Sequence, residues 1–299
     1  MSDQASGLRQ FRMARQENTA DESGYPMTIA VTSGKGGVGK TNIVANLALA
    51  LIRHKLRVVI LDADFGLANI DVLLALSPKY HLGHLLFGEK SLNEIMIEGP
   101  SGLQIIPAGS GIQELTQLTP FQEMHLFESL CSLRNACDFL LIDTAAGISK
   151  NVVRFLLASN EVIVVTQPEP TAIVDAYAVI KVLAHNTNPD QPLRVRIVVN
   201  QVADAREAES VFNQISSACT RFLRRDMAML GYIPWDASLV DSVRQQKALL
   251  QGHPNSSAGR QFMALAKKLK AEWEKGSRTV PLLFRPGFMR SEYNLPAEP

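Results

Sequence analysis

The glycine-rich stretch SGKGGVGKT at residues 33–41 constrains this chain more than any other part of it. Residues 28–32 before it predict a strand, and residues 42–51 after it predict a helix. Residues 34–41 match the phosphate-loop pattern G-x-x-x-x-G-K-[ST]. Glycines let backbone N–H groups converge on an anion, and a helix start adds unpaired N–H groups and a positive dipole end. The stretch therefore predicts a phosphate-binding turn between a strand and a helix.

Each residue type in this loop has an expected contact with a nucleotide. The Lys40 side chain can reach the terminal phosphates, and the Thr41 hydroxyl can ligate Mg²⁺. Lys35 is not required by the general pattern, and the simplest alternative is a solvated loop lysine. The full set of expected nucleotide contacts in the loop is Gly34, Lys35, Gly36, Gly37, Val38, Gly39, Lys40, Thr41 and Asn42.

Two further predicted strands end in carboxylates. Residues 56–61 form a β-branched run that leads into Asp62 and Asp64, and residues 139–142 form an apolar run that leads into Asp143. The carboxyl ends of parallel strands meet where α/β sheets bind their ligands. We therefore expect Asp62 and Asp143 to bind Mg²⁺, directly or through water, and Asp64 to orient or deprotonate an attacking water.

The spacing of these runs predicts an α/β fold with a doubly wound, mostly parallel sheet, as in P-loop nucleoside triphosphatases. Residues 161–166 and 194–199 supply two more buried strands, and Asn200 follows the second. Its amide offers one donor group and one acceptor. The guanine-reading pattern N-K-x-D is absent because Gln201 replaces the lysine, which favours adenine.

Composition limits the remaining function classes. The 299 residues are 46% hydrophobic and 20% charged, which is typical of a globular protein. A net charge of +1 gives no broad basic field, so we expect no direct nucleic-acid binding. Three cysteines without a C-x-x-C pair favour a reducing compartment and disfavour an iron–sulfur carrier. No signal peptide or membrane-spanning run is visible, so we expect a cytoplasmic protein.

The two ends of the chain differ from its middle. We expect a mobile arm at residues 1–25, an ATPase domain at residues 26–276 and a tail at residues 277–299. The arm either has no role or folds as a short helix on a partner. Residues 280–290 concentrate Leu, Phe and Met with two arginines, so the tail either anchors weakly at a membrane or packs on the domain or a partner.

Residues 27–275 resemble the MinD/ParA class of ATPases, through motifs that follow one another in that class's order. They are GKGGVGKT at 34–41, DADFGLANID at 62–71, DTAAGI at 143–148 and DAYAVIK at 175–181. The third motif has Ala145 where many relatives have proline. The resemblance implies a slow, switch-type ATPase that uses ATP and Mg²⁺ and dimerises when ATP is bound.

In that class the extra lysine, here Lys35, crosses the dimer interface and contacts the partner's nucleotide. The resemblance therefore implies catalytic roles for Lys35, Lys40 and Asp64. It also implies that three residues contact the adenine: Asn200, Pro234 and Asp236. Residues 167–168, Gln-Pro, replace the Cys-Asp that is common in flagellar members, which puts membrane recruitment in doubt more than ATP binding.

Within the class, the chain is similar to the FlhG family (also called FleN or YlxH), which regulates flagellar number and placement. DQASGLR at residues 3–9 resembles the family's D-Q-A-x-x-L-R motif, which stimulates the GTPase FlhF, a signal-recognition-particle-type partner. The implied contact residues are Asp3, Gln4, Ala5, Leu8 and Arg9. The family further implies a flagellar transcription activator and basal-body (C-ring) proteins as partners, and weak contact with the inner membrane at the cell pole.

Two other function classes remain open at this point. A MinD/ParA-type ATPase for division-site selection or for DNA or cargo partition would need a clear membrane helix or strong, salt-sensitive DNA binding. A scaffold would bind nucleotide but scarcely hydrolyse it. A phosphate-release assay separates the scaffold from the two ATPases.

Overall fold

The protein was analysed as a computed structural model, which describes residues 24–66, 69–109, 118–187, 193–276 and 280–284. Within these residues the strands form one eight-stranded sheet in the order β3-β4-β2-β5-β1-β6-β7-β8. All neighbouring pairs are parallel except β3 with β4. The strands are β1 (Met27–Thr32), β2 (Val58–Ala63), β3 (Ile97–Glu98), β4 (Gln104–Ile106), β5 (Phe139–Thr144), β6 (Glu161–Thr166), β7 (Arg194–Val202) and β8 (Ala228–Pro234).

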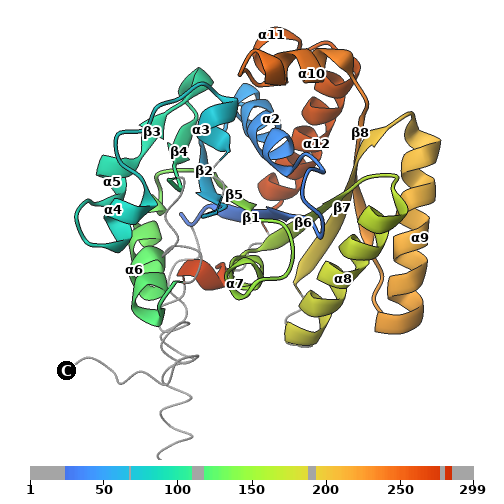
Figure 1. Ribbon diagram of the computed structural model, residues 1–299, viewed down its shortest axis with the longest axis horizontal. Coiled ribbons are helices and arrows are strands. Elements are labelled where there is room, and N and C mark those ends of the chain that lie inside the picture. The colour runs from blue at the N-terminus through green and yellow to red at the C-terminus, as the bar shows by residue number, and fades with distance from the viewer. Residues whose placement is uncertain (1–23, 67–68, 110–117, 188–192, 277–279, 285–299) are drawn as a thin grey trace, which may run out of the picture.

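Helices cover both faces of the sheet, as Figure 1 shows for α2 and α12 on one side and α7 and α8 on the other. The α-helices are α2 (Lys40–Arg53), α3 (Ile70–Leu73), α4 (Leu82–Leu86), α5 (Leu92–Ile95), α6 (Pro120–Leu130), α7 (Lys150–Ala158), α8 (Pro170–Asn186), α9 (Ala205–Leu223), α10 (Ala237–Arg244), α11 (Leu249–Gly252) and α12 (Ser257–Glu274). Three 3₁₀ turns are also described, η1 (Pro100–Gly102), η3 (Cys131–Leu133) and η4 (Leu282–Phe284). The predicted doubly wound, mostly parallel α/β fold is confirmed.

The position of β1 explains where a ligand can bind. β1 lies between β5 and β6, and the chain leaves it to build β2 on one side and later β6 on the other. The connections therefore diverge at the carboxyl end of β1, which is where open α/β sheets have their binding crevice. The predicted phosphate loop, residues 33–39, begins at this point and leads into α2.

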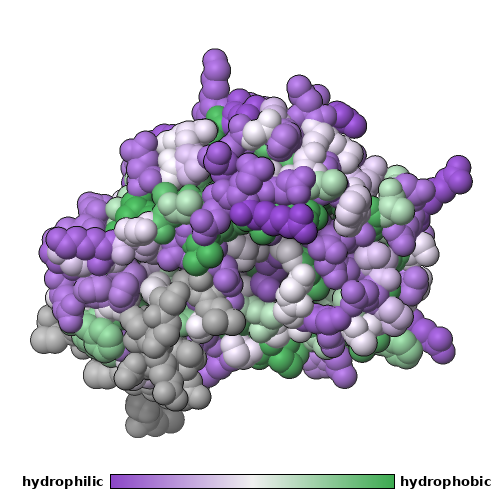
Figure 2. Space-filling model, turned by 45° about the horizontal axis from the view of Figure 1, so that its top comes forward, coloured by the Kyte–Doolittle hydropathy of each residue, from purple (hydrophilic) through white to green (hydrophobic). Residues whose placement is uncertain are grey.

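Two apolar cores, one on each face, hold this arrangement. β2, β5 and β6 are buried along their whole lengths and β1 from Thr28 on, because helices cover both faces of the sheet. Figure 2 shows one face of the molecule, where hydrophilic residues predominate and hydrophobic ones form small separate patches. None of the described helices is long and apolar enough to cross a bilayer.

The domain extends past both predicted boundaries. Leu283 and Phe284 of η4 are buried, and η4 contacts α6 and α7. The ring of Phe284 lies 5.4 Å from that of Tyr25, and the Arg134 guanidinium lies 4.6 Å from the centre of the Tyr25 ring. The predicted boundaries at residues 25 and 276 therefore leave Tyr25, Leu283 and Phe284 outside the domain whose core they join. Of the two alternatives for the tail, its described residues 280–284 pack on the domain, where burial of a Leu or Phe side chain is worth about 1.5–3 kcal/mol.

Candidate nucleotide-binding site

The phosphate loop has the backbone that its glycines predict. Gly39 precedes α2 with φ of 90°, in the left-handed region, and a Cβ there would lie 2.4 Å from Nδ2 of Asn200. A Cβ on Gly34 would lie 2.2 Å from the carbonyl oxygen of Asp175 in α8. Both positions therefore need glycine, one for its conformation and both for space. The loop is held between α8 and the end of β7.

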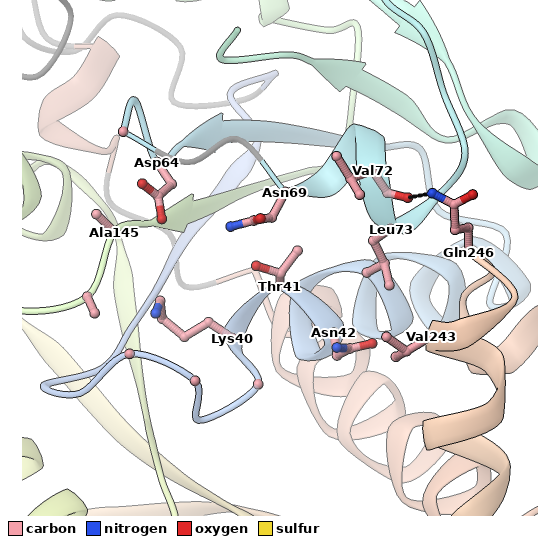
Figure 3. A pocket seen from close by; sticks show the side chains of 15 residues that line it. Lys40, Thr41, Asn42, Asp64, Asn69, Val72, Leu73, Ala145, Val243 and Gln246 are labelled. Atoms are coloured by element: carbon pink, nitrogen blue, oxygen red, sulfur yellow. Dashed lines mark hydrogen bonds between the residues drawn. The ribbon is translucent and has the colours of Figure 1, made fainter. Parts of the chain in front are cut away.

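Lys40, the first residue of α2, is almost fully buried, and its Nζ donates to Oγ of Ser33 at 3.1 Å. Burial lowers the pKa of Lys40, while the carboxylates of Asp143 and Asp64 act in the opposite direction. In Figure 3 the side chains of Lys40, Thr41 and Asp64 point into one cavity. The ammonium group is therefore placed where it can meet phosphate oxygens.

Asp62 and Asp143 lie opposite each other at the carboxyl ends of β2 and β5. Each is 1% exposed, and Oδ1 of Asp143 has no hydrogen-bond partner within the described residues. The pKa of Asp143 is raised to about 7, mainly by burial and to a smaller extent by the charge of Asp64, against the lowering effects of the Thr41 hydroxyl and Lys40. Burial and the charge of Asp143 raise the pKa of Asp62 well above its usual range. This buried oxygen, next to a hydroxyl, fits the oxygen ligands that Mg²⁺ prefers.

Asp62 also holds the segment that carries Asp64. Its Oδ1 accepts a hydrogen bond from the backbone N–H of Asp64 at 3.1 Å. Its Oδ2 accepts from the N–H groups of Asn69 and Ile70, at 3.3 and 3.4 Å, where α3 begins. A contact between Asp62 and Mg²⁺ stays a prediction, whereas its support of the Asp64 segment is visible in these hydrogen bonds.

The phosphate cavity is a space of about 650 Å³ between the loop, the β2–α3 segment, the end of β5 and α10. Gln246, which follows α10, donates from Nε2 to the carbonyl oxygen of Val72 in α3 at 3.1 Å, across the cavity (Figure 3). The residues that line the phosphate cavity are Gly36, Gly37, Gly39, Lys40, Thr41, Asn42, Asp64, Gly66, Asn69, Val72, Leu73, Ala145, Ala146, Val243 and Gln246. Sequence reasoning missed Asn69 and Gln246, because only the fold brings them to the loop.

The base cavity is a second space, of about 330 Å³, between the end of β7 and the turn from β8 to α10. It shares Gly39, Asn42 and Val243 with the phosphate cavity, so the two meet at the start of α2. Its lining residues are Gly39, Asn42, Asn200, Gln201, Pro234, Trp235, Asp236, Leu239, Val240, Val243 and Arg244. The three predicted adenine contacts all lie in it, together with Gln201 and Trp235, which were not among the predicted contacts although Trp235 belongs to the segment 231–236 that resembles the family's adenine loop.

Asn200 is 2% exposed and has a fixed orientation in the base cavity. Its Nδ2 donates to the carbonyl oxygen of Val38 at 2.8 Å, which ties β7 to the phosphate loop. Its Oδ1 is buried without a hydrogen-bond partner in the described chain. The side chain therefore keeps one buried acceptor without a partner in the described chain, and the sequence showed it only as an amide of undefined direction.

Asp236 has a structural task that the sequence did not predict. Its Oδ1 accepts from the N–H of Ser238 and caps α10, and its Oδ2 accepts from the Ser257 hydroxyl and the Ala258 N–H at the start of α12. Burial alone would raise the pKa of Asp236, but the hydrogen bonds outweigh it and lower the pKa to about 2. A contact between this carboxylate and adenine stays a prediction.

Lys35 does not line the phosphate cavity. It lies beside the cavity, on a rim formed by the loop and the start of α8. Its Nζ forms an ion pair with Glu169 at 2.6 Å and a hydrogen bond with Oγ1 of Thr171 at 3.3 Å. Both partners belong to the start of α8, and the side chains of Lys35 and Glu169 are 40% and 53% exposed. The five predicted partner contacts, Asp3, Gln4, Ala5, Leu8 and Arg9, lie outside the described residues.

A phosphate loop with a buried lysine, followed in the sheet by strands that end in buried carboxylates, defines a P-loop nucleoside triphosphatase. The comparison with family models agrees, since residues 25–270 match the ParA model, described as an iron-transfer P-loop NTPase of the NUBPL type. The chain belongs to the ParA family. The described residues contain no group of three or more His, Cys, Asp or Glu side chains that could hold a metal ion.

Individual relatives narrow the resemblance. The chain is 43% identical over 242 residues to the antiactivator FleN of Pseudomonas aeruginosa, which covers 81% of this chain and 85% of FleN. It is 34% identical over 283 residues to the flagellum site-determining protein YlxH of Helicobacter pylori, covering 94% and 95%. Among solved structures, the septum site-determining protein MinD of Pyrococcus horikoshii, complexed with Mg-ADP, matches with a TM-score of 0.69, 25% identity and coverage of 85% and 100%. The resemblance read from the motifs is confirmed.

Proposed function

We propose that this protein is a slow ATPase that switches between a monomer and an ATP-bound homodimer, and so regulates flagellar number and placement. The observation that carries the proposal is the phosphate loop with Lys40 buried beside Asp143, in a chain similar to FleN over most of its length. Such a protein would be located in the cytoplasm, with weak contact at the inner membrane near the cell pole.

The choice of ATP over GTP follows from the direction of the Asn200 amide. Because one N–H of its Nδ2 donates to Val38, the oxygen of Asn200, which lines the base cavity, is left as a buried acceptor without a partner among the described residues. The 6-amino group of adenine can donate to that oxygen, whereas the 6-oxo group of guanine would place two acceptors together. Asn200, Pro234 and Asp236 are the proposed adenine contacts.

Hydrolysis requires positioning and charge neutralisation more than covalent help from the protein. Thr41, Asp143 and Asp62 are the residues that would hold Mg²⁺, which would supply positive charge at the phosphates when bound. The Lys40 ammonium group neutralises charge on the phosphate oxygens, and Asp64 orients the attacking water. The loop residues from Gly34 to Asn42 hold the phosphates through their N–H groups.

Dimerisation is proposed to use the rim that carries Lys35. In the monomer its ammonium group is paired with Glu169, and an exposed surface pair of this kind is worth only about 0–1 kcal/mol. ATP on a second subunit offers a stronger anionic partner. Lys35→Ala should therefore abolish ATP-dependent dimerisation, measured by light scattering, while monomeric ATP affinity is kept. The matched change Lys55→Ala, on the turn after α2, should leave both unchanged; equal dimerisation by Lys35→Ala would remove Lys35 from the interface.

The arm is the proposed effector of an FlhF-type GTPase. This rests on the similarity of residues 3–9 to the family motif and on the flagellar relatives. The decisive experiment is GTP hydrolysis by the purified GTPase, with the full chain and with residues 1–23 removed. Stimulation that disappears with the arm supports the proposal. No stimulation by either form would favour a division-site or partition ATPase, an alternative that the similarity to MinD proteins supports.

The remaining partners follow from the same flagellar role. A flagellar transcription activator would connect the switch to gene expression, and basal-body C-ring proteins would connect it to assembly. The name of the FleN relative, an antiactivator, supports the first of these contacts. Co-purification of each candidate with the chain, in ATP and in ADP, tests whether binding follows the nucleotide state.

A further inference from the structure

The turn between β8 and α10 presents a tryptophan to solvent beside the base cavity. Trp235 is 62% exposed, although it lies between two residues with structural contacts. Pro234 is the last residue of β8 and pairs with Val202, and Asp236 caps the start of α10. An exposed tryptophan is by itself no sign of function, so its setting decides what it means.

The backbone of Trp235 is fixed on both sides. Its own N–H donates to the carbonyl oxygen of Val202 in β7 at 2.8 Å. The next residue, Asp236, is tied both to α10 and to the start of α12 through its two carboxylate oxygens. The indole is therefore exposed on a turn whose backbone is fixed, so little backbone entropy is lost when a ligand binds to it.

The walls of the base cavity match the surface of a purine. The cavity has apolar side chains at Val240 and Val243, which are 39% and 38% exposed, in addition to Trp235. Its unused buried acceptor is the Asn200 oxygen, which suits the edge of a ring. Val243 lies beside Asn42 at the start of α2, so a bound base would connect to the phosphate loop (Figure 3). The indole completes this set with an aromatic face.

We propose that Trp235 stacks against the purine ring of the bound nucleotide and so strengthens binding without selecting the base. This rests on the proposed function as an ATP-binding switch. Aromatic stacking accepts every base, because each base has a π-face. The two residues then have different roles: Asn200 distinguishes adenine from guanine, and Trp235 adds affinity for both bases.

Binding of three ligands to Trp235→Ala and Trp235→Phe tests the proposal. By calorimetry, the alanine variant should lose about tenfold in affinity for both Mg-ATP and Mg-GTP, so that their ratio is unchanged. The phenylalanine variant keeps a ring and should stay close to the original protein. Tripolyphosphate, which has no base, should bind the original protein and both variants equally. Unchanged ATP affinity in Trp235→Ala would overturn the proposal.

Fluorescence gives a second, direct readout. The chain has two tryptophans, and Trp273 packs on Phe139, with ring centres 5.9 Å apart. In a Trp273→Phe background, ATP should change the emission of Trp235, whereas tripolyphosphate should not. Emission that ATP leaves unchanged would also overturn the proposal. If the original protein bound no ATP at all, the proposed function itself would fail, and the two failures are therefore distinguishable.

Discussion

The phosphate cavity and the base cavity meet at the start of α2, but they are built in different ways. At the phosphate cavity the charged groups are buried, with Asp143 at the end of β5 1% exposed and Lys40 at the start of α2 9% exposed. The base cavity has one buried amide, Asn200 in β7, but its carboxylate, Asp236, lies on a turn at the surface beside the exposed Trp235. Buried charged side chains therefore form the phosphate cavity, whereas backbone hydrogen bonds and helix caps hold the base cavity in place. Changes in the phosphate cavity should therefore affect phosphate binding and hydrolysis, and changes in the base cavity should affect base binding and stability.

The largest effect is expected in the phosphate cavity. Lys40→Ala removes a buried cation that faces Asp143 and Asp64. Loss of one partner from a buried charge pair costs about 2–5 kcal/mol, so ATP affinity should fall by about a hundredfold or more. Calorimetry with Mg-ATP measures it, and Lys55→Ala, on the turn after α2, serves as the matched control because its lysine belongs to neither cavity. A loss of less than fivefold would mean that the buried lysine does not hold phosphate.

The next effect separates binding from chemistry within the same cavity. Asp64→Ala should keep ATP affinity within about threefold and lose about a hundredfold or more in turnover, as expected when a group that orients water is removed. Phosphate release and ATP-dependent dimerisation are the measurements, and the variant should stay dimeric in ATP. Asp71→Ala in the same segment is the control. A monomer in saturating ATP would show that Asp64 acts in binding instead.

A smaller effect is expected in the base cavity, on stability. Asp236→Ala removes a helix cap and the tie to α12, which should cost about 1–2 kcal/mol in urea unfolding at pH 7. Because the folded-state pKa is lowered to about 2, this contribution is present above about pH 4 and is lost as the pH falls towards 2. The difference between the original protein and the variant should shrink accordingly. Asp241→Ala, on exposed α10, should change little, and an equal loss there would contradict the double cap.

The smallest effect is a gain. Gln201 has φ of 58°, in the left-handed region, where β7 is irregular opposite β8. Gln201→Gly should raise stability by about 0.5 kcal/mol, because relief of the strained backbone slightly exceeds the entropy that glycine adds to the unfolded chain. Arg224→Gly, with φ of 51° at the end of α9, is the matched control away from the cavity. A drop in melting temperature for Gln201→Gly alone would indicate that its side chain packs as part of the turn.

The sequence predicted the phosphate side better than the base side. Lys40, Thr41 and Asp143 belong to motifs whose spacing follows from one strand and one helix start, so local patterns were enough. The roles of Asn200 and Asp236 depend on Val38 and on Ala258, residues that lie far away in the chain. No local pattern reports such contacts. The burial of Phe284 was missed for the same reason, since it depends on Tyr25 at the other end of the domain.

The contact between Tyr25 and Phe284 has a consequence for truncated variants. Tyr25 lies one residue from the start of the described chain and Phe284 is its last residue, so the contact joins the two ends of the described domain. A truncation that removes either ring exposes the other and should therefore lower the stability of the whole domain.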